Sequence, residues 1–241
     1  MLSRRDRMRA ETTSEIKATA RRILVEKGLT EVTLRAIARE MGMTAPALYR
    51  YFDSHEDLLE HVIGDIFKEI GADIGAAINA AGAGGPGDTS LMTRKMVAAC
   101  REFRRWGLDH QAEFGLLFGS PLPTMDAIHD DVVSECAAQF SGVFFALFFD
   151  LWSRHPFSVP ADDEIDPHLL PQLAAFRAGL GANMPLGGIL TFLRCWVRLY
   201  GMVSLEVFGH LRFAVADPAP MFEITLSELA DLVGLEYPER S

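Results

Sequence analysis

The chain contains few cysteines and none of the common signatures of a catalytic site. Its three cysteines, Cys100, Cys136 and Cys195, lie far apart and form no CxxC pair. This usage argues against a disulfide framework or a zinc site and predicts free, mostly buried thiols in a reducing cytosol. HExxH, GxSxG, a P-loop and a GxGxxG motif ahead of a strand are absent as well, so we expect neither an enzyme nor a cofactor.

One group of residues has the helical spacing of metal ligands. Asp126, His129 and Asp130 could share one turn of a helix. A single turn with a single histidine is more often a solvated surface than a metal site. We therefore expect no metal.

The sequence also lacks a segment suited to a membrane. Residues 1–13 have no apolar core, as a signal peptide would require. The longest uncharged run, Ala178 to Leu193, has 16 residues and includes four glycines and Pro185, whereas a spanning helix needs roughly 17 or more apolar residues. These features predict a soluble, cytoplasmic protein that has no membrane partner.

Charge is distributed unevenly along the chain. The formal net charge is −10, which by itself argues against nucleic acid. Residues 1–52, however, hold 11 Lys or Arg and 6 Asp or Glu, a net of +5, so the remainder carries −15. A basic head on an acidic body is typical of a small DNA-binding domain attached to a larger domain, although chance asymmetry on solvated faces would produce the same balance.

The stretch from Thr33 to Phe52 has the pattern of a helix-turn-helix. Its first helix has one apolar face, formed by Leu34, Ile37, Ala38 and Met41 at i, i+3, i+4 and i+7. Gly42 follows where the chain must turn. Thr44 can cap a second helix that carries Pro46 in its first turn and Leu48 toward the core. This pattern predicts a second helix that lies in the DNA major groove.

The remaining sequence predicts an all-α protein. Thr12 and Glu15 form a capping box for a first helix. We expect helices at about 12–27, 33–40, 44–50, 54–78, 90–107, 109–118, 124–153, 183–211 and 217–234. A glycine-rich loop is expected at 80–90, and a proline-rich acidic loop at 155–171 that includes a short helix after Pro167.

These elements group into three parts. Residues 1–11 are predicted to be a basic flexible arm, whose four arginines either stay in a disordered tail or meet phosphate or the minor groove. Residues 12–60 form a three-helix DNA-binding domain that contains the helix-turn-helix. Residues 61–241 form a larger helical domain for regulation and dimerisation.

The DNA-binding segment resembles a known family. The matching positions are Gly28, Val32 to Arg35, Ile37, Ala38, Gly42, Thr44, Ala47 to Phe52, Ser54, Glu56, Leu58 and Leu59. Over residues 12–60 they resemble the DNA-binding domain of TetR-family bacterial transcriptional regulators. The run from Trp196 to Gly201 is similar to a Trp, three residues, His-Gly motif of one C-terminal domain class of that family, with Tyr200 in place of the histidine.

The residue types and this resemblance imply two sets of DNA contacts. Phosphate contacts are expected from Thr33, Tyr49, Tyr51 and His55. Base contacts are expected from Arg35, Thr44, Ala45, Pro46 and Arg50. His55 occupies a position where the family commonly has a phosphate-binding lysine, so its charge would depend on pH.

Some of these side chains could have a structural role instead of a DNA contact. Tyr49 could be a surface aromatic that packs on the first helix, and Tyr51 could be partly core. Leu48 and Phe52 are predicted to be core. Thr33 and Thr44 are helix caps first, so a DNA contact would be a second use of the same hydroxyl.

The large second domain must dimerise, sense a ligand or catalyse a reaction. Two apolar helices, 183–211 and 217–234, are candidates for a four-helix homodimer interface that would place two heads on a palindromic operator. The alternative is that their apolar stripes pack only within one chain.

Aromatic residues in this domain could line a pocket for a small, largely apolar effector, or form plain core. The candidates are Trp106, Phe114, Phe118, Phe144, Phe148, Trp152, Trp196 and Tyr200. Arg101, Arg104, Arg105, Arg194 and Arg198 could pair with an anionic ligand, or could be solvated or paired. The sequence therefore predicts a ligand-responsive regulator, most simply a repressor. The competing class is a helical small-molecule-binding or catalytic protein whose basic head does not bind DNA.

Overall fold

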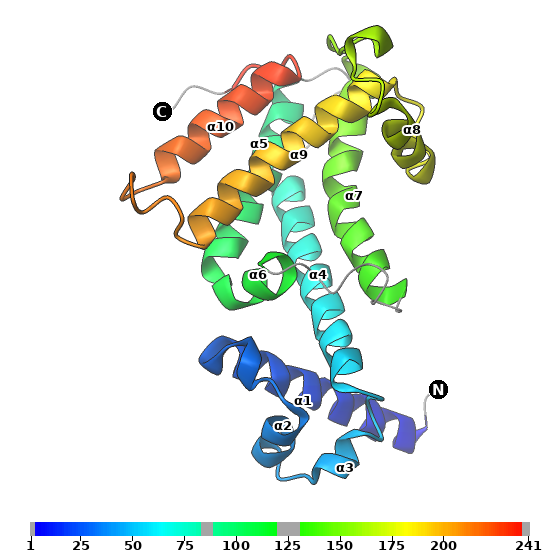
Figure 1. Ribbon diagram of the computed structural model, residues 1–241, viewed down its shortest axis with the longest axis vertical. Coiled ribbons are helices and arrows are strands. Elements are labelled where there is room, and N and C mark those ends of the chain that lie inside the picture. The colour runs from blue at the N-terminus through cyan, green and yellow to red at the C-terminus, as the bar shows by residue number, and fades with distance from the viewer. Residues whose placement is uncertain (1–2, 83–88, 120–130, 238–241) are drawn as a thin grey trace. The chain divides into compact units, whose positions relative to one another are not determined.

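A computed structural model describes residues 3–82, 89–119 and 131–237 of the chain, and these residues form ten α-helices and no strand (Figure 1). The all-α prediction is confirmed. Contacts divide the chain into two units, an N-terminal unit of residues 3–71, 109–119 and 131–140 and a C-terminal unit of residues 72–82, 89–108 and 141–237. The division differs from the boundary predicted at residue 60, because α4 continues past it and the α6 segment returns to the N-terminal unit.

The N-terminal unit begins with three helices packed around one apolar core. They are α1 (Arg4–Lys27), α2 (Leu34–Glu40) and α3 (Ala45–Leu48). The buried stripe of α1 is the predicted one: Ile16, Ala20, Ile23 and Leu24. Ile37 and Leu48 are fully buried and Ala38 is 3% exposed. A helix as short as α3 has little stability of its own, so this packing holds it in place.

The start of α1 differs from the prediction. The helix begins at Arg4, and its capping box is formed by Ser3 and Asp6, whose side chains each accept the other residue's backbone N–H at 3.1 Å. Thr12, the predicted cap, lies inside the helix and donates its hydroxyl to the Met8 carbonyl at 3.0 Å. Residues 4–11 are therefore helical and not a flexible arm, because they contain no helix breaker and an earlier cap is available.

Helix α4 (His55–Ala80) runs through three glycines and passes from one unit to the other. Ser54 caps it and accepts the Asp57 N–H at 3.0 Å, as predicted. In the N-terminal unit the aromatic side chains of Phe67, Phe118 and Phe140 contact one another with ring centres 5.7–6.0 Å apart. These contacts explain why α6 (Gln111–Phe118) and the first residues of α7 (Asp131–Arg154) belong to the N-terminal unit.

The C-terminal unit is arranged around α9 (Leu186–Val207), which packs against α8 (Leu170–Gly179) and α10 (Ala219–Leu232) (Figure 1). Helix α5 (Thr89–Asp109) and most of α7 complete it. The short helix predicted after Pro167 corresponds to α8, and a 3-10 turn lies at Asp162–Glu164. Most of the predicted glycine loop, the predicted start of α7 near residue 124 and the Asp126–Asp130 group lie outside the described residues.

Helix α9 is long and apolar enough to cross a membrane by composition alone. Half of this apolar stretch is buried inside the unit. The core helix of a globular protein meets the same criteria of length and composition. The buried half includes Gly187, where an added Cβ would lie 2.0 Å from the Pro160 carbonyl oxygen. This glycine lets the loop before α8 cross directly over the helix.

Candidate DNA-binding surface and apolar pocket

The turn between α2 and α3 is built by two threonines and a glycine. Thr33 caps α2, and its hydroxyl oxygen accepts the Ala36 N–H at 3.1 Å. Gly42 has φ 65°, the left-handed conformation that the turn requires. Thr44 occupies the N-cap position of α3, but its hydroxyl makes no cap hydrogen bond. The predicted cap at Thr33 is thus confirmed, whereas the side chain of Thr44 does not cap α3.

The predicted base-reading and phosphate-binding side chains lie on the surface of this motif. Eight of the nine belong to α2, α3 and the turn after α3 or cap these helices directly, and the ninth, His55, begins α4. The residues Thr33, Arg35, Thr44, Pro46, Tyr49 and Arg50 are exposed, and Ala45, Tyr51 and His55 are half-buried. Phe52 and Leu48 fill the core beneath them, at 2% and 0% exposure, as predicted. One surface therefore carries the donors and apolar groups that a major groove contact needs.

Tyr51 has a partner that the sequence did not reveal. The guanidinium of Arg9, on α1, lies 5.7 Å from the centre of the Tyr51 ring, within the range of a cation–π contact. The same guanidinium donates through Nη2 to the Arg50 carbonyl at 3.0 Å. The first turns of α1 thus hold the end of the helix-turn-helix in place. Arg9 and Arg50 are 41 residues apart in sequence, so the sequence pattern does not predict this contact.

His55, at the start of α4, is engaged in a contact within the unit. Its Nε2 lies 2.5 Å from the Val32 carbonyl oxygen, so Nε2 carries the proton and donates to that oxygen. A neutral ring then has no second N–H for a phosphate, and only the protonated ring could donate through Nδ1. The ring therefore joins the start of α4 to the segment before α2.

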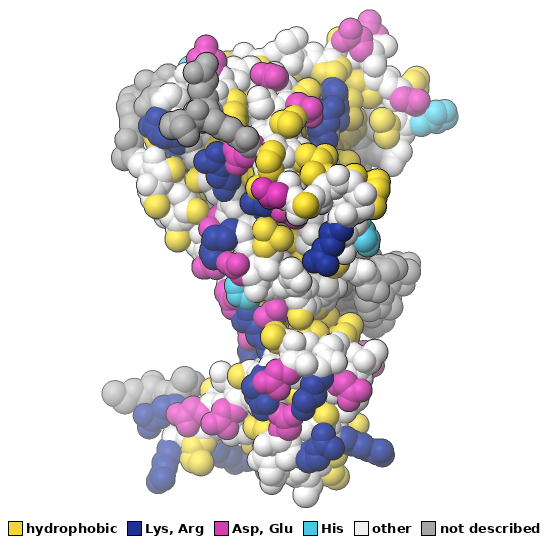
Figure 2. All heavy atoms as spheres, turned by 90° about the vertical axis from the view of Figure 1, so that its left-hand side faces the viewer, with side chains coloured by type: hydrophobic (Ala, Val, Ile, Leu, Met, Phe, Trp, Pro, Cys, Tyr) yellow, Lys and Arg dark blue, Asp and Glu magenta, His cyan; other side chains and the backbone are white. Residues whose placement is uncertain are grey.

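Basic side chains are numerous in the N-terminal unit. Figure 2 shows dark blue Lys and Arg side chains along the lower edge of this unit, with carboxylates among them farther up. Several of those carboxylates pair with cations of the same unit: Glu40 pairs with Lys27 at 2.6 Å and with Arg22, and Lys17 pairs with Asp65 at 2.5 Å. Hydrogen bonds from Lys27 and Arg22 lower the pKa of Glu40 below its usual value.

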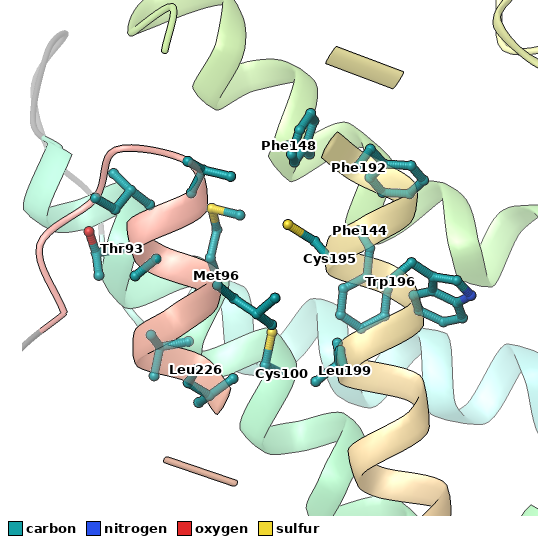
Figure 3. A pocket seen from close by; sticks show the side chains of 15 residues that line it. Thr93, Met96, Cys100, Phe144, Phe148, Phe192, Cys195, Trp196, Leu199 and Leu226 are labelled. Carbon is teal, nitrogen blue, oxygen red and sulfur yellow. The ribbon is translucent and has the colours of Figure 1, made fainter. Parts of the chain in front are cut away.

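The C-terminal unit contains an apolar pocket between α5, α7, α9 and α10 (Figure 3). Fifteen residues line it: Thr93, Met96, Val97, Cys100, Phe144, Phe148, Phe192, Cys195, Trp196, Leu199, Leu226, Leu229, Ala230, Val233 and Leu235. The cavity has a volume of about 70 Å³. The hydroxyl of Thr93 already donates to the Thr89 carbonyl at 3.0 Å, so the walls offer a ligand no strong polar partner.

Two thiols face this pocket from opposite helices. Cys100 projects from α5 and Cys195 from α9 (Figure 3). Burial raises the pKa of Cys100 to about 12 and that of Cys195 to about 11. Both groups are therefore neutral thiols near neutral pH and act as polarisable apolar walls rather than as nucleophiles.

The eight predicted pocket aromatics divide into separate groups. Phe144, Phe148 and Trp196 line the pocket. Tyr200 stacks on Trp196 at 6.0 Å, Trp152 packs edge-on against Phe157, and Trp106 is fully buried in α5. Phe114 and Phe118 lie in the N-terminal unit and do not line the pocket. The aliphatic walls from α10 and the two cysteines were not among the predicted residues, since nothing in their spacing distinguishes pocket from core.

The arginines considered as partners for an anionic ligand are largely neutralised. Arg104 forms a bidentate pair with Glu206 at 2.5–2.6 Å, and Arg105 pairs with Glu102. Arg101 donates to Glu223 at 2.7 Å and to the hydroxyl of Tyr237 at 3.2 Å. Arg194 and Arg198 are exposed on α9. Among the described residues, no group of three or more metal-ligating side chains is assembled.

The chain is similar to known proteins over almost its whole length. Residues 16–62 match the family profile described as bacterial regulatory proteins of the tetR family, and residues 96–229 match that of the tetracycline repressor-like C-terminal domain. The HTH-type transcriptional regulator Rv1816 of Mycobacterium tuberculosis is 26% identical over 222 residues, which cover 91% of each chain.

Solved structures show the same architecture. The crystal structure of SCO4313 has a TM-score of 0.72 and 26% identity, covering 95% of this chain and 100% of the other. A protein of unknown function from Rhodococcus sp. RHA1 has a TM-score of 0.62 at 17% identity, covering 92% and 94%. At that lower identity the second likeness supports the fold alone.

Proposed function

Since the chain belongs to the TetR family of bacterial transcriptional regulators, we propose that it is a repressor, acts as a homodimer on a palindromic operator, and is released by a small, largely apolar effector. As a member of this family it is a DNA-binding regulator with a ligand-binding domain and not an enzyme. Beyond family membership, we propose repression as the sign of regulation, a homodimer as the assembly, a set of DNA-contacting residues and an apolar class of effector. We also propose that the protein is cytoplasmic.

The observation that carries the DNA-binding part is the outward face of the helix-turn-helix. Arg35 and Arg50 are exposed cations of this motif and the best candidates for guanine contacts, while Ala45 and Pro46 offer a surface for a thymine methyl. Thr33, Tyr49, Tyr51 and a protonated His55 would bind phosphates. Two strong base readers in each copy are few, so affinity depends on having two copies one helical turn apart, roughly 34–36 Å.

An exposed apolar stripe supports the dimer. On α9, Val197 and Leu205 are 65% and 43% exposed, and on α10 Ile224 is 59% exposed. Val197 and Leu205 are eight residues apart and so lie on one face of their helix. Figure 2 shows hydrophobic side chains gathered among charged ones on one face of this unit. A second copy that covers the two helices would form a four-helix interface.

The pocket supports an apolar effector. Its walls carry no unpaired charge, so an ionised ligand would lose its hydration without compensation. Its volume of about 70 Å³ is below the roughly 150 Å³ of a dry cavity that holds benzene. An effector must therefore spread the walls, and this is how binding would favour a second conformation. To reverse a 99:1 preference for the DNA-competent state, the effector must bind the other state tighter by about 5.5 kcal/mol.

A salt-titrated DNA-binding assay tests the function. Wild-type protein should bind a fragment of its own promoter, and the affinity should fall steeply with salt. Arg35→Ala with Tyr49→Ala should weaken binding, while Arg154→Ala on α7 should not. If the wild type shows no salt-dependent binding and the double variant changes nothing, the protein is instead a helical small-molecule binder whose basic head is incidental.

Light scattering tests the assembly. The wild type should have the mass of a dimer at micromolar concentration, and Val197→Glu, which places a charge on the exposed stripe, should produce monomers. A wild type that is a stable monomer would rule out the interface.

A further inference from the structure

A basic groove lies where the first turns of α1 meet the end of the helix-turn-helix. Arg4, Arg5, Met8, Arg9 and Thr12 line one side of it, and Arg50 and Tyr51 line the other. The groove has a volume of about 510 Å³. Four of its seven residues are arginines and none is acidic, so this surface has a strongly positive potential and suits an anion.

The arginines are held in place and are not on a loose tail. The Ser3–Asp6 capping box starts the helix directly before Arg4, so Arg4 and Arg5 project from a regular helix. Arg9, one to two turns farther on, fastens this helix through the Arg50 carbonyl and the Tyr51 ring. Because their backbone is already ordered, these side chains would lose less conformational entropy on binding than those of a flexible arm.

The guanidinium groups of Arg4 and Arg5 are also available to bind an anion. Among the described residues, neither Arg4 nor Arg5 forms an ion pair or a hydrogen bond through its side chain, and both are exposed. The opposite wall is formed by Arg50 and Tyr51, which the proposed function already assigns to DNA. A duplex that contacts Arg50 therefore lies next to the groove, and its sugar-phosphate backbone is the nearest anion.

We propose that the first turns of α1 form a second DNA-contacting element, in which Arg4 and Arg5 bind backbone phosphates that flank the half-site contacted by α3. The inference rests on the proposed DNA-binding function and extends its footprint. Arg9 is a positioning residue in this arrangement, since it holds Arg50 and Tyr51 at the correct distance from the helix that carries the two phosphate-binding arginines.

The salt dependence of binding tests the phosphate contacts. The probe is a labelled duplex that carries the site protected by the wild-type protein in its own promoter fragment. Each lost phosphate contact lowers the slope of log K against log salt by about 0.9. Arg4→Ala with Arg5→Ala should therefore lower the slope by about 3 to 4 in a dimer, since two contacts are lost in each copy.

Arg7 provides a matched control. It lies in the same turns of α1, carries the same charge and is exposed, but it does not line the groove. Arg7→Ala should change the slope by less than about 1. On a duplex trimmed to the half-sites that α3 contacts, the wild type should lose its advantage over the double variant, because the flanking phosphates are gone.

The outcomes separate this inference from the proposed function. If the wild type binds specifically and the double variant behaves like Arg7→Ala, the second element does not exist, although the regulator function stands. If the wild type does not bind the promoter fragment at all, the function itself fails. Equal losses on long and trimmed duplexes would also overturn the inference, since they would show that Arg4 and Arg5 act inside the site.

Arg9 is tested by specificity and not by affinity alone. Arg9→Ala should lower the ratio of affinities for the site and for a scrambled duplex, because Arg50 and Tyr51 lose their support. Arg9→Lys keeps a cation that can donate to the Arg50 carbonyl and should restore part of the ratio. A ratio that is unchanged in Arg9→Ala, with the fold intact by circular dichroism, would refute the positioning role.

Discussion

Arg21 joins three helices of the N-terminal unit, and its loss should destabilise the protein strongly. From α1 its Nη2 donates to Glu69 of α4 at 2.8 Å, and its Nε donates to Glu113 of α6 at 3.1 Å. The side chain of Glu113 is only 6% exposed, whereas that of Arg21 is 29% exposed. Hydrogen bonding to Glu69 raises the pKa of Arg21 above its usual value, so the cation persists at every pH where the protein is folded.

The expected loss of unfolding free energy follows from the burial of Glu113. Arg21→Met removes the cation that compensates a buried carboxylate, and breaking such a pair costs about 3–5 kcal/mol. In a chain of 241 residues, each kcal/mol lowers the melting temperature by roughly 2–4 °C, so we expect a loss of about 6–20 °C.

Thermal denaturation followed by circular dichroism measures this loss, with two further variants for comparison. Arg21→Met with Glu113→Gln removes both charges of this pair, so that no unpaired carboxylate is left buried, and should recover part of the stability that the single variant loses. Arg154→Met breaks an exposed pair with Asp150, in which both side chains are more than 40% exposed, and should cost at most about 1 kcal/mol. The reasoning fails if Arg21→Met costs no more than Arg154→Met, or if the double variant recovers nothing.

Three further predictions follow from the C-terminal unit. Gly187→Ala would place a Cβ 2.0 Å from the Pro160 carbonyl oxygen, so it should cost about 1–3 kcal/mol of unfolding free energy in urea titrations. Tyr237→Phe removes a hydroxyl that donates to a glutamate of α10 and should cost about 1 kcal/mol. Burial, together with the hydrogen bond to Glu223, raises the pKa of Tyr237 to about 12. The hydroxyl therefore stabilises the protein fully below pH 10 and loses its contribution as the pH rises through 12. At that pH the variant and the wild type should converge in stability. The thiols of Cys100 and Cys195, whose pKa values are raised to about 12 and 11, should react with iodoacetamide far more slowly at pH 8 than they do in urea, and equal rates by mass spectrometry would contradict their burial.

The helix-turn-helix could be predicted from the sequence because its signals are local. The spacing of Leu34, Ile37 and Ala38, the turn at Gly42 and the cap at Thr33 each act within a few residues. The start of α1 was predicted wrongly for an equally local reason. Ser3 and Thr12 both begin a capping-box pattern, and the sequence does not say which of two consecutive caps is used. The helix uses the earlier one because nothing between them interrupts it.

The contacts that hold the motif and shape the pocket depend on helices that are distant in sequence. Periodicity shows that the aromatic residues of α7 are buried, but not which neighbours they meet. Phe144 and Phe148 line the pocket, whereas Trp152, one turn farther on, does not, although Phe148 and Trp152 both pack edge-on against Phe157. Phe118 meets Phe67 in the other unit altogether. The same apolar spacing on a helix occurs whether its side chains fill a core or line a cavity. Which of the two forms depends on how closely the opposing helices approach. In this pocket that approach is set by the C-terminal side chains from Leu226 to Leu235, and no feature of the aromatic segment predicts it.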